Sequence, residues 1–386
     1  MTKRRILLAV AVVVVGALGV VLSLTGVTRD GAPAVLGDPA VLTYAPATGA
    51  SDVAPLDPVT VSVAKGTLES VELRGPDGPV PGTLDPGRTR WTSNAPLAYA
   101  TTYTWSGSAV GTDGSTTPLA GTVTTVTPKE QVRAVINIGD GRTVGIAAPI
   151  AIQFDAHVDD RAAVERALKV ETSVPVEGAW GWLPDEGGGS RVHWRPKEYW
   201  PANTKVTVTA TLFGVPYGGG AWGARDVSST FSIGPAQIVK ADVTSHRLLV
   251  VRDGRTVADF PASYGLDTDP ARNTRSGIHV VTEKFENRRM ISQQFDYDVV
   301  MQWAVRISNN GEFIHANPDT VAAQGSRNVS HGCINLSPDN AKAYYDSARY
   351  GDPVEVTGSN VQLSARDGDI WDWTLTWEQW QRLSAL

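Results

Sequence analysis

The sequence predicts a mainly β protein built from several domains. At 386 residues the chain is too long for one compact domain, and its balance of 42% hydrophobic and 19% charged residues is that of a globular protein. Most of it alternates short runs of β-forming residues with turn residues. We expect five segments, at residues 1–36, 37–129, 130–235, 236–358 and 359–386.

The first segment has the pattern of an export signal. Three basic residues within positions 1–5 precede an uncharged run over residues 6–28. This run is long enough to cross a bilayer as a helix, which takes about 20 residues, and a buried core helix has no reason to be apolar on every face. Because residues 32–34 match a cleavage site poorly, we expect a retained helix in the plasma membrane, with a cleaved signal as the alternative. Either way, the rest of the chain is expected on the outer side.

The second segment is typical of a β-sandwich. Residues 59–63, 103–105 and 122–126 are short runs rich in β-forming residues. Glycine, proline and aspartate cluster between them, at 74–78 and 84–87, in the combinations that form tight turns. Short, evenly spaced strands with such turns favour two packed antiparallel sheets.

The third segment repeats the second. Residues 149–154 correspond to residues 58–63, and Trp194 corresponds to Trp91, 103 positions earlier. A repeat of this length is that of a whole sandwich. We therefore predict two tandem immunoglobulin-like domains, which most simply act as spacers.

The fourth segment is predicted as a β-rich domain with one or two helices. Residues 238–243 and 247–251 form a hairpin pattern. A helix is expected over residues 340–349, with Ser337 as its N-cap and Pro338 at its first position.

The last segment is a short tryptophan-rich subdomain. Thr376 and Gln379 have the spacing of a capping box, which opens a final helix. We expect the aromatic side chains to pack the tail onto the preceding domain, with a sugar-stacking surface as the alternative. They are Trp371, Trp373, Trp377 and Trp380.

The single cysteine, Cys333, calls for a chemical explanation. An exported chain with one cysteine has no internal disulfide, and its thiol is exposed to oxidation. A cysteine attacks as the thiolate and needs a base nearby, which His315 or His331 supplies. Gly332 lets the backbone approach a substrate closely, and Asn335 carries an amide for orienting one.

Two other interpretations of these residues, and one other function for the whole chain, are weaker. A buried inert cysteine has no need of the surrounding Ser-His-Gly-Cys sequence. A zinc site would have only three soft ligands, His315, His331 and Cys333, so no metal is expected. A net charge of −6 and a pI near 5.6 leave no basic surface for nucleic acid.

The motif closely resembles a known signature. His315, followed fifteen positions later by Ser330-His331-Gly332-Cys333-Ile334-Asn335, is similar to that of the L,D-transpeptidase catalytic domain, the YkuD-like fold. With two preceding sandwiches and a tryptophan-rich tail, the chain resembles the actinobacterial, mycobacterial-type branch over nearly its whole exported part.

The resemblance implies roles for these residues. Cys333 would be the nucleophile and His315 its general base. Ser330, His331 and Gly332 would form the nucleophile loop, with the backbone N–H groups of Gly332 and Cys333 holding the oxyanion.

Three further residues would serve the substrate and the base. Asn335 would bind substrate, and Tyr297 would lie on a lid beside the pocket. Met290 and Trp303 fall near Tyr297 and are expected to be packing residues. Ala316 departs from the family's usual serine, but its backbone carbonyl would still orient the imidazole.

The resemblance also implies a reaction. The enzyme would cleave the terminal D-alanine from a peptidoglycan tetrapeptide stem and join the acyl group to a second stem as a 3→3 cross-link, without a cofactor. Carbapenem β-lactams would acylate the same thiol. The motif leaves open an L,D-carboxypeptidase, in which water is the acceptor, and, less favoured, a non-catalytic wall-binding protein.

Overall fold

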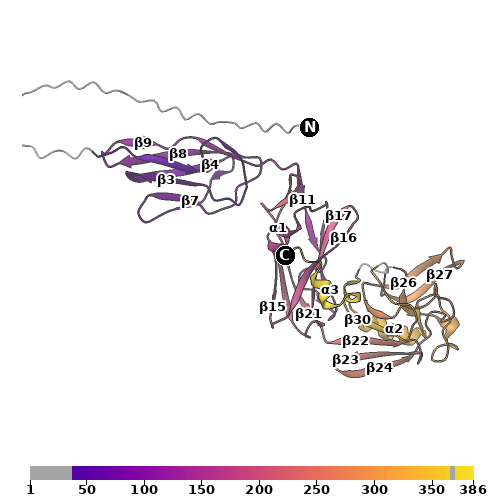
Figure 1. Ribbon diagram of the computed structural model, residues 1–386. Helices are drawn as coiled ribbons and strands as arrows, with labels where there is room; N and C mark the ends of the chain where they lie inside the picture. The colour runs from indigo at the N-terminus through magenta and orange to yellow at the C-terminus, as the bar shows by residue number, and fades with distance from the viewer. Residues whose placement is uncertain (1–36, 309, 366–369) are drawn as a thin grey trace, which may run out of the picture.

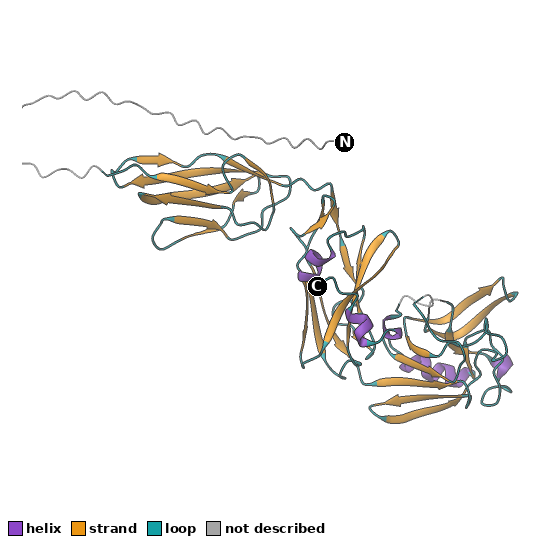
Figure 2. Cartoon of the chain, viewed as in Figure 1, coloured by secondary structure: helices purple, strands orange, loops and turns teal. Residues whose placement is uncertain are grey.

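A computed structural model describes residues 37–308, 310–365 and 370–386. Figure 1 shows three β-rich bodies in a bent row, from the indigo N-terminal sandwich to the orange and yellow C-terminal part. Strands dominate throughout, and the few helices are short (Figure 2). Among the described residues no helix is long and apolar enough to cross a membrane, and the expected anchor at residues 6–28 lies outside them.

The first body is a sandwich of two sheets. One sheet has the order β1 (Val41–Ala45), β3 (Thr60–Ala64), β7 (Arg90–Ser93) and β6 (Gly82–Leu84). The other has the order β2 (Ala50–Val53), β10 (Thr122–Thr125), β8 (Thr102–Gly111), β4 (Gly66–Gly75) and β5 (Gly78–Pro79), with β9 (Thr116–Pro118) paired to β8. Alternate residues of these strands form one apolar core that includes Val61, Trp91 and Trp105.

The second body repeats the arrangement. Its sheets have the orders β12 (Ala134–Ile136), β14 (Ile150–Phe154), β17 (Gly189–Pro196), β16 (Gly178–Glu186), and β13 (Thr143–Val144), β21 (Val227–Ile233), β18 (Lys205–Ala210), β15 (Leu168–Thr172). A small sheet of β11 (Glu130–Val132), β20 (Ala221–Gly223) and β19 (Pro216–Gly218) and helix α1 (Arg161–Arg166) complete it. Trp91 pairs with Val61 and Trp194 with Ile150, on equivalent neighbouring strands, although the alignment of the repeat makes Ile152 the counterpart of Val61, so the register differs by two residues.

The third body holds two sheets and one longer helix. The first sheet has the order β24 (Arg255–Pro261), β23 (Arg247–Arg252), β22 (Gln237–Asp242), β30 (Pro353–Thr357) and β25 (Gly277–Val280). The second has the order β26 (Glu283–Ser292), β27 (Tyr297–Arg306), β28 (Phe313–Ala316) and β29 (Ile334–Leu336). The hairpin and the helix, α2 (Pro338–Ser347) with Ser337 as its N-cap, are confirmed.

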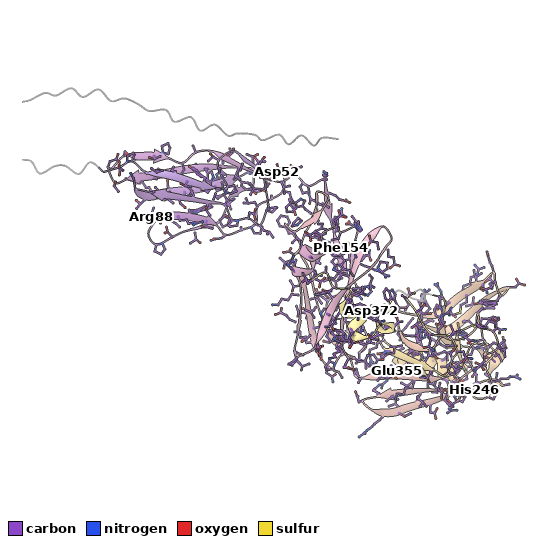
Figure 3. All side chains as sticks on the ribbon, viewed as in Figure 1. Asp52, Arg88, Phe154, His246, Glu355 and Asp372 are labelled. Carbon is purple, nitrogen blue, oxygen red and sulfur yellow. The ribbon has the colours of Figure 1, made fainter. Side chains whose placement is uncertain are left out.

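The C-terminal tail corrects one expectation. Residues 361–363 pair with Ser276 of the third body, but the tail then crosses to the second sandwich. There Trp380 donates to the carbonyl of Ala179, and His193 and Asp372 form a buried pair at 2.9 Å. Figure 3 shows Asp372 between the two bodies.

The tail helices are short and pack on the same sandwich. They are η2 (Asp372–Thr374) and α3 (Trp377–Gln381), and the latter opens with the predicted capping box at Thr376. Because Trp371 and Trp380 are buried against Leu183, they serve packing between bodies.

Candidate active site

Two parallel strands bring the predicted residues together. His315 lies on β28, and Cys333 immediately precedes β29, which pairs with β28 so that His315 faces Asn335. Behind them, apolar residues of β28 and β29 pack into the core of the third body beside α2. His315 and Cys333 are thus fixed by the same pair of strands.

His315 is held as a neutral imidazole. Its side chain is buried, and Nδ1 lies 2.9 Å from the carbonyl oxygen of Ala316. Because a carbonyl only accepts, the proton sits on Nδ1 and Nε2 keeps its lone pair. Burial lowers the pKa of His315 to about 4, although the bond to Ala316 opposes this shift. Ala316 therefore orients the imidazole through its backbone, as expected.

Cys333 is a neutral thiol in this state. Burial raises the pKa of Cys333 to about 12, and the backbone N–H of Phe313 partly offsets that shift. Its Sγ lies 3.5 Å from the carbonyl oxygen of Gly311, to which the S–H donates. Cys333 forms no disulfide, and the residue as a whole is partly exposed. A neutral thiol beside a neutral imidazole calls for proton transfer during attack rather than a preformed ion pair.

The nucleophile loop is a tight turn closed by Ser330. The Ser330 hydroxyl donates to the carbonyl of Cys333 at 2.6 Å and accepts the N–H of Gly332 at 3.1 Å. Gly332 has φ +120°, a conformation that other residues rarely adopt. The N–H of Gly332 was expected to hold the oxyanion, but here it already donates to the Ser330 hydroxyl. The N–H of Cys333 has no partner among the described residues.

His331 is largely exposed, and the aromatic rings of a lid pack against one part of it. Hairpin β26–β27 reaches over it, with ring centroids of Phe295 and Tyr297 at 4.7 and 5.4 Å from that of His331. Partial burial, followed by the charge of Arg272, lowers the pKa of His331. Burial and then Cys333 raise the pKa of Tyr297. His331 is thus better placed to support the lid than to act as the base.

A pocket joins these residues. It is lined by Met290, Tyr297, Val299, Met301, His315, Asn317, Thr320, Val329, Ser330, His331, Cys333 and Asn335. Met290 therefore lines the pocket, whereas Trp303 packs on Tyr345 of α2, as expected for a packing residue.

The side-chain amide of Asn335 has one unpaired hydrogen-bond acceptor. Its Nδ2 donates to the Thr320 hydroxyl at 3.2 Å, but its buried Oδ1 has no partner among the described residues. An unpaired buried acceptor is costly, and a substrate N–H would relieve that cost.

Several residues at the site carried no sequence signal. Arg272 donates to the carbonyls of Val329 and Ser330, and Thr320 contacts Asn335. They come from loops distant in sequence and could not have been found from the motif. Within the described ranges, no group of three or more His, Cys, Asp or Glu side chains is arranged to hold a metal ion.

Comparison with known proteins agrees with this geometry. Residues 236–356 match the family model described as the L,D-transpeptidase catalytic domain, and residues 50–216 match a bacterial Ig domain. The chain is 56% identical to L,D-transpeptidase 5 of Mycobacterium tuberculosis over 348 residues, covering 89% of this chain and 77% of that protein. It is 37% identical to L,D-transpeptidase 2 of the same species, covering 89% of this chain and 85% of that protein.

A solved structure is similar as well. The L,D-transpeptidase LdtMt1 in complex with imipenem has a TM-score of 0.50 and 34% identity, covering 60% of this chain and 100% of that one. The chain therefore belongs to the L,D-transpeptidase family, and its catalytic domain is that of an acyltransferase.

Proposed function

We propose that this enzyme forms 3→3 cross-links between peptidoglycan stems, with Cys333 as nucleophile and His315 as general base. The observation that carries the proposal is the pairing of β28 with β29. It brings both residues to one pocket, where the Ala316 carbonyl leaves Nε2 of the imidazole free to accept a proton.

The first step forms a thioester. As the Cys333 sulfur attacks the carbonyl of the third stem residue, His315 takes the thiol proton, because both groups start neutral. The carbonyl electron pair moves to oxygen, and the N–H of Cys333 is the group left to hold that charge. Collapse breaks the bond to D-alanine, whose amine leaves with the proton from His315.

The second step transfers the acyl group. A side-chain amine of another stem attacks the thioester, His315 accepts its proton, and the thiol is restored. Attack by water would instead make the enzyme an L,D-carboxypeptidase, and the product would be a tripeptide monomer in place of a dimer.

Substrate contacts follow from the pocket. The unpaired Oδ1 of Asn335 accepts an amide N–H of the donor stem, and Tyr297 covers the stem from the lid. Ser330, His331 and Gly332 shape the loop without contacting the reacting carbon.

A carbapenem presents a strained carbonyl to the same thiol. Since LdtMt1 has been solved with imipenem, we expect imipenem to acylate Cys333 here. We also place the catalytic body outside the plasma membrane, held by the apolar run at residues 6–28.

Intact-mass spectrometry tests the assignment of the nucleophile. The wild-type chain with imipenem, or with disaccharide-tetrapeptide, is expected to gain one adduct that peptide mapping places on Cys333. Cys333→Ala should gain none. An adduct on the alanine variant, or no adduct on the wild type, would contradict the assignment.

A further inference from the structure

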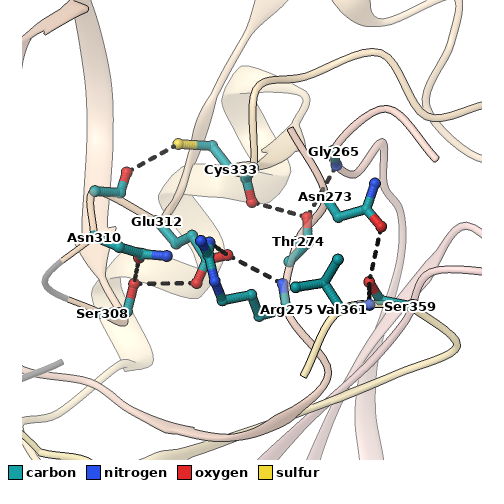
Figure 4. A network of polar contacts seen from close by, with 12 residues as sticks. Gly265, Asn273, Thr274, Arg275, Ser308, Asn310, Glu312, Cys333, Ser359 and Val361 are labelled. Atoms are coloured by element: carbon teal, nitrogen blue, oxygen red, sulfur yellow. Dashed lines mark hydrogen bonds and ion pairs between the residues drawn. The ribbon is translucent and has the colours of Figure 1, made fainter. Parts of the chain in front are cut away.

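The segment at residues 273–275 lies directly behind the nucleophile loop, and the Thr274 side chain forms a hydrogen bond to that loop. Thr274 is 1% exposed, and its hydroxyl donates to the carbonyl oxygen of Gly332 at 2.8 Å. The same hydroxyl oxygen accepts the backbone N–H of Gly265 at 2.9 Å. Figure 4 shows Thr274 between Gly265 and the loop that carries Cys333.

These two bonds fix the direction of the hydroxyl proton. Since the N–H of Gly265 only donates, the Thr274 oxygen accepts there. Since the carbonyl of Gly332 only accepts, the hydroxyl proton points to it. Neither bond can be reversed.

The bond to Gly332 also sets the direction of the next N–H. In a planar trans peptide the C=O of one residue and the N–H of the next point in opposite directions. Holding the Gly332 carbonyl toward Thr274 therefore turns the N–H of Cys333 away from Thr274. Without this bond the peptide plane could turn about ψ of Gly332 and φ of Cys333, and Gly332, which has no Cβ, restricts that rotation less than other residues would.

The result is an aligned chain of dipoles. It runs from the N–H of Gly265 through the Thr274 hydroxyl and the Gly332–Cys333 peptide to the N–H of Cys333. Each donor strengthens the next, because hydrogen bonds in series polarise one another in a low-dielectric interior. The chain ends on the one N–H of the Gly332–Cys333 pair that Ser330 does not occupy.

We propose that Thr274 is a positioning residue for the oxyanion hole, acting through the Gly332–Cys333 peptide. The inference rests on the proposed role of Cys333 as the acylated nucleophile. Thr274 does not touch the substrate. Its hydroxyl holds the Cys333 N–H toward the place where negative charge develops on the substrate oxygen, and so lowers the barrier to acylation.

The test compares two reactions of the same sulfur. Acylation by disaccharide-tetrapeptide, followed by D-alanine release, passes through an oxyanion. Alkylation by iodoacetamide forms a carbon–sulfur bond with loss of iodide and makes no oxyanion. Thr274→Val removes the hydroxyl at nearly constant shape, so kcat for D-alanine release should fall about 10- to 100-fold. KM and the alkylation rate should stay within about threefold.

Matched variants separate this role from a loss of structure. Thr274→Ser keeps the hydroxyl and should restore kcat. Thr204→Val removes another buried hydroxyl that donates to a backbone carbonyl, in the second sandwich, and should leave both rates unchanged. If Thr274→Val does not fold, Thr274→Ala makes the same comparison.

Two results would overturn the inference. One is an unchanged kcat in the hydroxyl-free variant. The other is an alkylation rate that falls in parallel with the acylation rate, since that would mean that the substitution has displaced the whole loop. The measurement on the wild type tests the proposed function separately. A wild type that is alkylated but releases no D-alanine would overturn the proposed function itself, and this inference with it.

Discussion

At the scale of single residues, the chemistry depends on two groups that are both neutral at rest. Burial lowers the pKa of His315 to about 4 and raises the pKa of Cys333 to about 12. Between these values the base is ready to accept a proton and the thiol still carries one. The motif names the two residues that we propose react, but it does not predict their protonation state, because burial is set by the packing of the sheet around them.

This state predicts the pH dependence of the reaction. His315 works only when neutral, so kcat/KM for D-alanine release should fall as the pH drops through about 4. The thiol ionises only far above neutral pH, so alkylation of Cys333 by iodoacetamide should rise steadily from pH 7 to 10. Stopped-time alkylation followed by mass spectrometry measures this. A flat, fast alkylation rate between pH 5 and 9 would reveal a preformed thiolate and contradict the neutral pair.

Residue-level prediction from sequence reached its limit at the supporting contacts. Cys333, His315 and Ser330 follow from a contiguous motif and one spacing. Gly311, whose carbonyl accepts the hydrogen bond of the thiol, and Arg272, which donates to the loop, belong to segments that meet the motif only after folding.

At the scale of elements, hairpin β26–β27 forms the lid of the pocket. Its inner face contributes Met290, Tyr297 and Val299 to the lining, and its outer face exposes Val300. The lid contacts the nucleophile loop through the rings of Phe295 and Tyr297 on His331. Tyr297 was predicted on a lid, but the partner of the lid was not, since ring contacts between distant segments leave no pattern in the sequence.

Removing one ring tests the lid. Phe295→Ala should raise KM for the tetrapeptide about 2- to 10-fold, because an aromatic contact contributes roughly 0.5–1.5 kcal/mol. Thermal unfolding should not change, since this contact lies outside the core. Val300→Ala, on the outer face of the same hairpin, is the control and should leave KM unaltered. Equal effects of the two variants would mean that the contact with His331 does not hold the lid.

At the scale of the whole molecule, the C-terminal tail joins the catalytic body to the second sandwich. Arg195 of β17 lies under three tryptophan rings, with distances of 4.7, 5.5 and 5.1 Å to Trp373, Trp377 and Trp380. Its Nη2 also donates to the carbonyl of Leu375. The tryptophan content predicted that the tail would be buried. The expected partner, the preceding catalytic domain, was wrong, because apolar area is not specific for one surface.

The tail therefore contributes to stability across the two bodies. Arg195→Ala should lower the free energy of unfolding by about 2–4 kcal/mol, through lost stacking and the lost bond to the tail. Differential scanning calorimetry measures the loss, and limited proteolysis should cut the released tail. Arg161→Ala, which removes an arginine stacked on the single ring of Trp182, should cost much less. An unchanged transition in the Arg195 variant would show that the tail is not held there.

The individual elements of the fold could be predicted from the sequence, as the motif residues of the site could. The two sandwiches, their repeat, the β22–β23 hairpin and the caps of α2 and α3 were all expected from local patterns. The five segment boundaries remain predictions. What local patterns could not supply was the arrangement of one body against another, such as the backbone bonds from Gly145 to Tyr350 and from Ala147 to Gly351.

The central claim is acyl transfer from one stem to another through Cys333, and the products of the full chain with disaccharide-tetrapeptide test it most directly. Mass spectrometry should find a dimer that has lost one D-alanine, with a fragmentation pattern that places the new bond between the third residues of the two stems. Cys333→Ala should form none. Tripeptide monomer without any dimer would contradict cross-linking and identify water as the acceptor, making the enzyme a carboxypeptidase.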